Sequence, residues 1–112
     1  MESRGFSADR ARLERARELS DEDIVAMEQS ILADPHVGDL VPGTGGLRKV
    51  RVGQRAAGRG KRGGVRVYYL DLPRQRVTHL LAIFGKRQKS DLSVAERRQV
   101  AAAVQQLKEE TS

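Results

Sequence analysis

The sequence contains no cysteine and no tryptophan, and its only histidines are His36 and His79. The absence of cysteine excludes a disulfide framework, a thiolate nucleophile and a cysteine zinc site. Two histidines are too few for a histidine-based metal site, so we expect no metal and no other cofactor. The longest apolar stretch, residues 80–84, is far shorter than the roughly 18 residues of a membrane helix. Residues 1–19 are rich in arginine and glutamate, unlike a signal peptide, so we expect a cytoplasmic protein without membrane contact.

The chain has room for one hydrophobic core. Its 112 residues correspond to a single domain, which we place over residues 1–112. Hydrophobic residues make up 38% of the sequence, and the mean hydropathy of -0.55 is typical of a water-soluble chain with a modest core.

Positive charge is concentrated in the middle of the chain, although the net charge is only +6. Residues 1–39 carry 5 basic and 10 acidic side chains, and residues 90–112 carry 3 basic and 4 acidic ones. Residues 40–89 carry 13 basic side chains and one acidic side chain, Asp71. Such a segment attracts phosphate backbones and accelerates encounter with them. The alternative is a solvated basic surface without a specific partner.

Two helices are predicted within residues 1–39, packed as an antiparallel pair. Ser7 is a candidate cap for a short helix over residues 8–18. Ser20 precedes a second helix, whose first turn holds three acidic residues that the helix dipole favours. This helix should end before Pro35, because the residue that precedes a proline avoids helical geometry.

Three strands are predicted between residues 47 and 84, joined by hairpins into an antiparallel sheet. Residues 47–53 alternate between two faces, and residues 65–71 are rich in β-branched and aromatic side chains. Residues 77–84 are nearly all apolar, which predicts a central strand covered on both faces. Residues 53–64 combine glycines with arginines and lysine and form a basic loop.

The last predicted element is a C-terminal helix over residues 93–110. Ser93 and Glu96 have the spacing of a capping box, in which each side chain binds the backbone of the other residue. The predicted fold class is therefore α+β, with two N-terminal helices, a three-stranded antiparallel sheet and a C-terminal helix.

Basic side chains recur on the predicted strands. Lys49 and Arg51 share one face of the first strand, and Arg66 and Tyr68 share one face of the second. Neighbouring strands lie about 5 Å apart, so these groups can converge on one surface. Guanidinium groups match the charge that develops when a 2′-hydroxyl attacks an RNA phosphate. A lysine surrounded by cations can accept a proton, yet a nonspecific RNA-binding groove would contain the same residues.

Three segments resemble the RelE/HigB toxins of bacterial type II toxin–antitoxin systems, most closely the HigB-like branch. They are G-T-G-G-L-R-K-V-R at 43–51, G-K-R-G-G-V-R-V-Y-Y at 60–69 and F-G-K-R-Q-K-S-D-L-S at 84–93. The resemblance covers roughly residues 6–108. It implies a compact RelE-like fold and metal-independent, ribosome-dependent cleavage of mRNA in the A site. It also implies neutralisation by a cognate antitoxin, often a helix-turn-helix protein.

The resemblance also implies roles for particular residues. The catalytic positions fall on Lys49, Arg51, Arg66 and Arg87, with Lys49 as the leading candidate for the base. Some relatives carry an aromatic residue shortly after the last arginine; here that stretch is Ser-Asp-Leu-Ser at 90–93, and Tyr68 is the candidate replacement. We further predict RNA contacts for a second set of residues: Arg48, Arg59, Lys61, Arg62, Tyr68, Lys86 and Lys89.

Other interpretations stay open at this point. An ion pair with Asp71 or with a helix carboxylate is the alternative for Arg66. His79, within the most apolar strand, is expected to be a hydrogen-bonded core residue. The leading function is an mRNA endoribonuclease that leaves a 2′,3′-cyclic phosphate and a 5′-hydroxyl. The alternatives are a ParE-like inhibitor of DNA gyrase with the same fold and a noncatalytic RNA- or ribosome-binding module.

Overall fold

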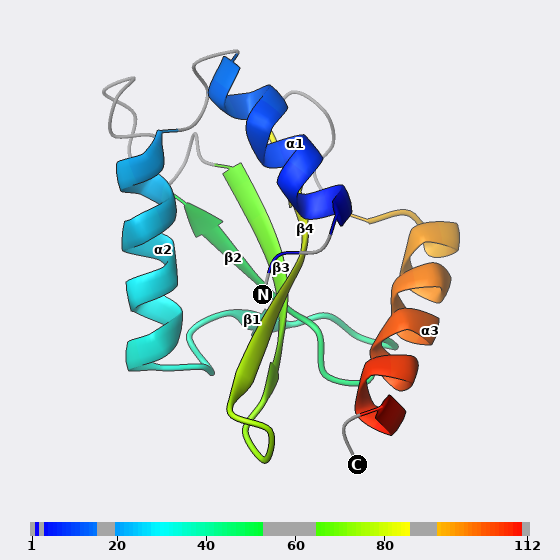
Figure 1. Cartoon of the computed structure of the whole chain (residues 1–112). Helices are drawn as coiled ribbons and strands as arrows, with labels where there is room; N and C mark the ends of the chain where they lie inside the picture. The colour runs from blue at the N-terminus through cyan, green and yellow to red at the C-terminus, as the bar shows by residue number, and fades with distance from the viewer. Residues whose placement is uncertain (1, 3, 16–19, 53–64, 86–91, 111–112) are drawn as a thin grey trace.

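The computed structural model describes residues 2, 4–15, 20–52, 65–85 and 92–110, and it confirms the predicted α+β class (Figure 1). Its described elements are α1 (Arg4–Arg15), α2 (Asp21–Ala33), β1 (Asp39–Leu40), β2 (Arg48–Val52), β3 (Val65–Leu72), β4 (Val77–Phe84) and α3 (Val94–Glu110). The strands form one antiparallel sheet in the order β1-β2-β3-β4. No helix in the described ranges is both long and apolar enough to cross a membrane.

The predicted capping signals place two helix starts correctly. The Ser20 side chain accepts a hydrogen bond from the Asp23 backbone N–H at 3.2 Å, and the Asp23 carboxylate accepts one from the Ser20 N–H at 3.1 Å. Ser93 and Glu96 form the same reciprocal pair at the start of α3, with distances of 3.1 and 2.9 Å. Each pair satisfies backbone donors that a helix start leaves without partners.

The first helix begins earlier than the sequence suggested. α1 starts at Arg4, so Ser7 lies inside the helix, where its hydroxyl donates to the Glu2 carboxylate at 2.9 Å. Phe6, which precedes the predicted start at residue 8, is part of α1 and is fully buried in the core. Burial of the Phe6 ring in the core stabilises the extra N-terminal turn of α1. A capping pattern in the sequence does not reveal this burial energy.

The sheet differs from the prediction in two respects. A fourth strand, β1, pairs Asp39 with Lys49 and Leu40 with Arg48; its two residues are too few to show an alternating pattern. The strand predicted as central, β4, is the last in the sheet, and β3 occupies the interior. The apolar character of β4 reflects helices on both of its faces, and its outer edge meets Glu2 through a single bridge opposite Leu80.

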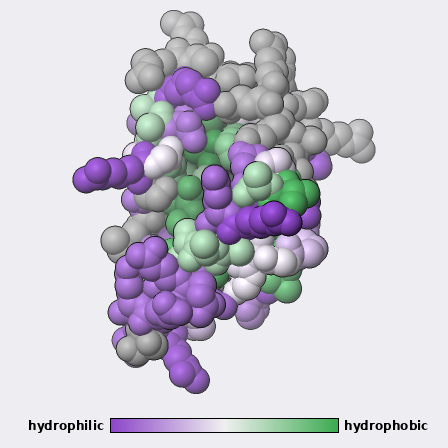
Figure 2. Space-filling model, turned by 90° about the vertical axis from the view of Figure 1, so that its right-hand side faces the viewer, coloured by the Kyte–Doolittle hydropathy of each residue, from purple (hydrophilic) through white to green (hydrophobic). Residues whose placement is uncertain are grey.

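Two cores lie on opposite faces of the sheet. We call them the α1/α2 face and the α3 face, after the helices that cover them. α1 packs over β4 and α2 over β2. The α1/α2 core contains Phe6, Leu13, Ile24, Met27, Ile31, Val65, Val67, Tyr69, Leu80 and Ile83. The buried residues on the α3 face are Val41, Leu47, Tyr68, Leu70, Leu72, Leu92 and Val104. On the side of the molecule where α3 lies, hydrophobic residues are visible in a recess flanked by hydrophilic ones (Figure 2).

Tyr69 fixes the loop between α2 and β1. Its hydroxyl donates to the Pro35 carbonyl at 2.7 Å and accepts from the Gly38 N–H at 3.0 Å. Burial raises the pKa of this hydroxyl, so it stays protonated. Arg48 donates to the Gly38 carbonyl at 2.7 Å. A Cβ on Gly38 would lie 2.7 Å from the Lys49 carbonyl oxygen, so glycine is required for this close approach.

Tyr69→Phe should lower the free energy of unfolding by about 1–3 kcal/mol, because the Gly38 N–H and the Pro35 carbonyl lose a buried partner. Urea denaturation followed by circular dichroism measures the change. An unaltered free energy of unfolding would show that the hydroxyl does not hold this loop.

His79 departs from the hydrogen-bonded core residue that we expected. It lies opposite Leu70 on the α3 face, and its buried Nε2 atom has no hydrogen-bond partner within the described part of the chain. Burial lowers the pKa of the imidazole below its ordinary value of 6.5. His79 is therefore more difficult to protonate in the folded chain than in the unfolded one.

This pKa shift makes stability depend on pH. Between the lowered folded pKa and the unfolded value of 6.5, the unfolded chain binds more protons, so stability is lost as the pH falls below about 6.5. His79→Leu should flatten that part of the profile of unfolding free energy against pH. His36→Gln, at an exposed position, is the matched control and should keep the wild-type slope. An identical slope in His79→Leu and the wild type would contradict the assignment.

Candidate nucleic-acid interface

The register between β2 and β3 places three predicted catalytic cations on one face of the sheet. Arg51 lies directly opposite Arg66, and Lys49 lies opposite Tyr68 on the next pair along. Directly opposite residues of an antiparallel pair project to the same side, with Cβ atoms about 4.5–5.5 Å apart. Since residues two apart on a strand also share a side, Lys49, Arg51 and Arg66 all belong to the α3 face.

The Arg51–Arg66 pair carries two like charges directly across the strands. Arg51 is exposed and Arg66 is half-buried. Like charges in this position destabilise a sheet, and none of the ion pairs among the described residues neutralises either guanidinium group. A bound anion would relieve the repulsion. We call Lys49, Arg51 and Arg66 the cationic triad.

An ion pair between Arg66 and Asp71, the alternative considered from sequence, does not form. Asp71 lies opposite Thr78 on the α1/α2 face, and its carboxylate accepts a hydrogen bond from the Thr78 hydroxyl at 3.1 Å. Arg66 projects to the other face. The only acidic side chain within residues 40–89 is therefore kept away from the triad.

Sequence reasoning missed one acidic residue at this site. β1 places Asp39 directly opposite Lys49, on the same face as the triad, and the Asp39 side chain is exposed. A carboxylate beside a lysine can orient the ammonium group or accept a proton. In the sequence, Asp39 belongs to the acidic segment 1–39, away from the basic residues. A strand of two residues also has no alternating pattern that would reveal its pairing with β2.

Tyr68 is not available to stack on a base. It is fully buried, and its ring packs edge to face against Phe84, with ring centroids 5.8 Å apart. Leu47 and Leu92 belong to the same core cluster. A ring without an exposed face cannot contact RNA in this conformation, so the prediction that Tyr68 replaces the missing aromatic residue is wrong. Packing of a large ring between sheet and α3 determines its place.

Arg48 also lies away from the triad. It is opposite Tyr69 on the α1/α2 face, and its guanidinium group donates to the backbone carbonyls of Gly38 and His36. It holds the loop before β1 and is not placed to contact RNA together with Lys49 or Arg66. The RNA contact predicted for Arg48 stays a prediction, and it would lie on the other face of the sheet from the triad.

The remaining predicted site residues lie outside the described residues: Arg59, Lys61, Arg62, Lys86, Arg87 and Lys89. The described strands show only where the chain leaves the sheet before these segments and returns after them. β2 ends at Val52 and β3 begins at Val65, directly opposite each other, while Phe84 at the end of β4 lies opposite Arg66. All three strand ends are thus at the Arg51–Arg66 end of the sheet.

The triad can bind a polyanion and neutralise developing negative charge. Guanidinium and ammonium groups on one face of two adjacent strands can bind the oxygens of a phosphate backbone. Within the described ranges, no group of His, Cys, Asp and Glu side chains is arranged to hold a metal ion. No family model matches the chain.

Arg51→Glu should raise the free energy of unfolding by about 0.2–1 kcal/mol at low salt, because an attractive cross-strand pair replaces a repulsive one. High salt should shrink the gain by screening. Arg51→Gln, which removes the repulsion without adding attraction, should give an intermediate value. Urea denaturation at two salt concentrations measures both variants, and a loss of stability in Arg51→Glu would contradict the repulsive pair.

Proposed function

We propose that the chain is a ribosome-dependent mRNA endoribonuclease, the toxin of a type II toxin–antitoxin system of the RelE/HigB kind. The observation that carries the proposal is the cationic triad, with Arg51 and Arg66 directly opposite each other on one sheet face. The α+β architecture and the motif residues at 43–51, 60–69 and 84–93 add support. This activity places the protein in the cytoplasm, where ribosomes translate mRNA.

The proposed reaction is an internal transesterification of RNA. The 2′-hydroxyl attacks the adjacent phosphorus, a 2′-oxygen–phosphorus bond forms, and the bond to the 5′-oxygen breaks, giving a 2′,3′-cyclic phosphate and a 5′-hydroxyl. Lys49 accepts the proton from the 2′-hydroxyl, and Asp39, opposite it on β1, is the second candidate acceptor. Arg51 and Arg66 bind the phosphate oxygens as negative charge develops. Arg87 stabilises the negative charge on the departing 5′-oxygen, which takes its proton from water.

Dependence on the ribosome follows from the weakness of this proton-transfer machinery. The described part of the α3 face contains the half-buried His79 and no exposed histidine beside the triad. Lysine and arginine neutralise charge well but transfer protons poorly near neutral pH. Holding the RNA in line for attack can supply several kcal/mol of the barrier reduction. The ribosome would supply that alignment, and a helix-turn-helix antitoxin would restrain the toxin.

A noncatalytic RNA- or ribosome-binding module is the second candidate. The same triad supports it, and the burial of Tyr68 favours it, because the described site then lacks an aromatic platform for orienting a base. Such a module would occupy ribosomes without producing cut RNA ends.

Primer extension on programmed ribosomes and on the same free mRNA separates the two candidates. We expect cleavage on ribosomes only, and loss by about 100-fold or more in Lys49→Ala, which removes the proposed proton acceptor. A similar loss is expected in Arg66→Ala, which removes charge stabilisation in the transition state. Arg87→Ala tests the position implied by the resemblance.

Arg74→Ala, in the exposed hairpin turn, is the matched control and should retain cleavage. Circular dichroism checks that every variant is folded. Ribosome binding without cut ends would establish the noncatalytic module. Equal cleavage of free mRNA, or full cleavage in all three variants, would overturn the proposed mechanism.

A further inference from the structure

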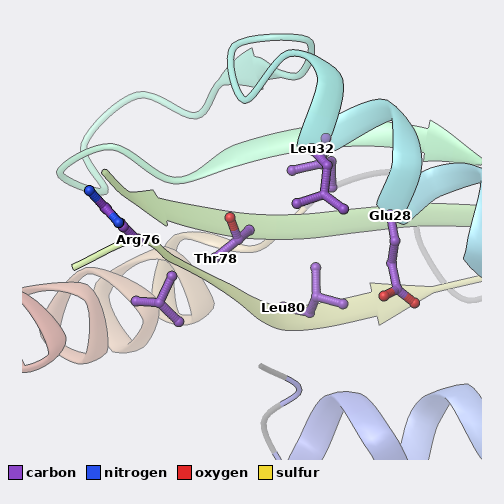
Figure 3. Close-up of a pocket in the computed structure, with 7 residues that line it drawn as sticks. Glu28, Leu32, Arg76, Thr78 and Leu80 are labelled. Carbon is purple, nitrogen blue, oxygen red and sulfur yellow. The ribbon is translucent and has the colours of Figure 1, made fainter. Parts of the chain in front are cut away.

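A pocket of about 290 Å³ lies on the opposite side of the sheet from the cationic triad (Figure 3). Leu80 and Thr78 on its floor face the α1/α2 side, opposite Tyr69 and Asp71 respectively. The lining residues are Glu28, Ile31 and Leu32 from α2, and Arg76, Val77, Thr78 and Leu80 from the β3–β4 hairpin. The pocket is therefore separate from the proposed nuclease site.

The pocket exists because the helical layer is incomplete there. α1 covers β4 and α2 covers β2, and the pocket lies between the last turns of α2 and the first half of β4 (Figures 1 and 3). β4 is the last strand of the sheet, and among the described residues Glu2 forms a bridge with it at Leu80. An additional element could occupy this place in the layer without displacing either helix.

The apolar surface continues outside the pocket along α2. Leu32 is 78% exposed and Val25 is 51% exposed. These residues are seven apart, so they lie on one row of the helix, with Glu28 between them. The pocket itself is at the lower end of the roughly 300–1,000 Å³ range of small-molecule sites. A side chain fills such a pocket while the rest of a larger ligand covers Leu32 and Val25.

The charges along this surface change sign from one end to the other. Exposed acidic residues Asp21 and Glu22 begin α2, and Glu28 stands at the pocket rim. The hairpin end carries Arg74 and Arg76, both exposed. None of the ion pairs recorded among the described residues involves Glu28 or Arg76. A ligand with basic groups at one end and acidic groups at the other is complementary to both ends.

Arg76 has a left-handed backbone conformation, which glycine adopts more easily than arginine. Its φ is +54°, in the left-handed region, and it is the only non-glycine residue with positive φ in the described ranges. Its N–H closes the hairpin turn onto the Pro73 carbonyl at 3.2 Å. Glycine adopts this conformation more easily, so turn geometry does not account for arginine here. Arg76 also lines the pocket, which places its side chain beside any ligand bound there.

We propose that the pocket and the Val25–Leu32 row bind an amphipathic helix of a partner protein. One apolar side chain enters the pocket against Leu80 and Ile31, and others cover Leu32 and Val25. Basic residues of the partner helix lie over Glu28 and the start of α2, and acidic residues lie beside Arg76. The site does not depend on the proposed nuclease activity, and a helix bound there leaves the cationic triad uncovered.

The test uses the full chain, labelled with 15N, and a designed helical peptide. The peptide carries leucines three, four and seven positions apart, lysines at one end and glutamates at the other. NMR titration should shift amide signals of residues 24–32 and 76–80. Leu32→Lys should weaken binding by about tenfold or more, and Arg76→Gly should weaken it several-fold while the hairpin keeps its shape. Val94→Lys, at an apolar position on α3 that is 67% exposed, is the matched control and should bind like the wild type.

Exchanging charges tests the orientation of the helix. A peptide with lysines in place of its glutamates should bind the wild type weakly and recover affinity for Arg76→Glu. Absence of binding, equal binding by Leu32→Lys, or signal shifts confined to the α3 face would overturn the proposal. Concentration-dependent dimerisation that Leu32→Lys abolishes, measured by sedimentation velocity, would also overturn it by identifying a second copy of this chain as the occupant.

Discussion

The alternation of β3 between two hydrophobic cores is the constraint on which the rest of the structure depends. Val65, Val67 and Tyr69 are buried under α1 and α2, while Tyr68, Leu70 and Leu72 are buried on the α3 face. A slip of one residue would exchange these faces and expose large apolar side chains. Arg66 is the cation on this strand and is only half-buried. The packing that fixes β3 therefore also determines which face carries positive charge.

The same strand connects the core to the edge of the site. The Tyr69 hydroxyl holds the loop at Pro35 and Gly38, and this loop leads directly into β1. β1 in turn brings Asp39 opposite Lys49. A carboxylate from the acidic N-terminal third thus reaches the basic face because one buried hydroxyl satisfies two backbone groups. Core packing and site chemistry are linked through a few hydrogen bonds.

The two sides of the sheet have different chemistry and support different proposals. The α3 face presents fixed cations, which suit a phosphate backbone. The α1/α2 face has a gap in its helical layer, with an apolar floor between Glu28 and Arg76. Since the sheet separates the two proposed sites, their ligands would not compete for the same surface. A ligand at the proposed α1/α2 site would leave the cationic triad uncovered.

Local signals in the sequence determined the α+β class, the helix starts at Ser20 and Ser93, and the shared faces of Lys49 with Arg51 and of Arg66 with Tyr68. Capping and strand alternation depend on residues close in the chain, so a pattern reports them directly. Only the tertiary structure decided that β4 ends the sheet, that Tyr68 is buried and that Asp39 meets Lys49. These outcomes depend on which distant segments pack together, and the free energy of burying a ring such as Phe6 or Tyr68 has no local signature.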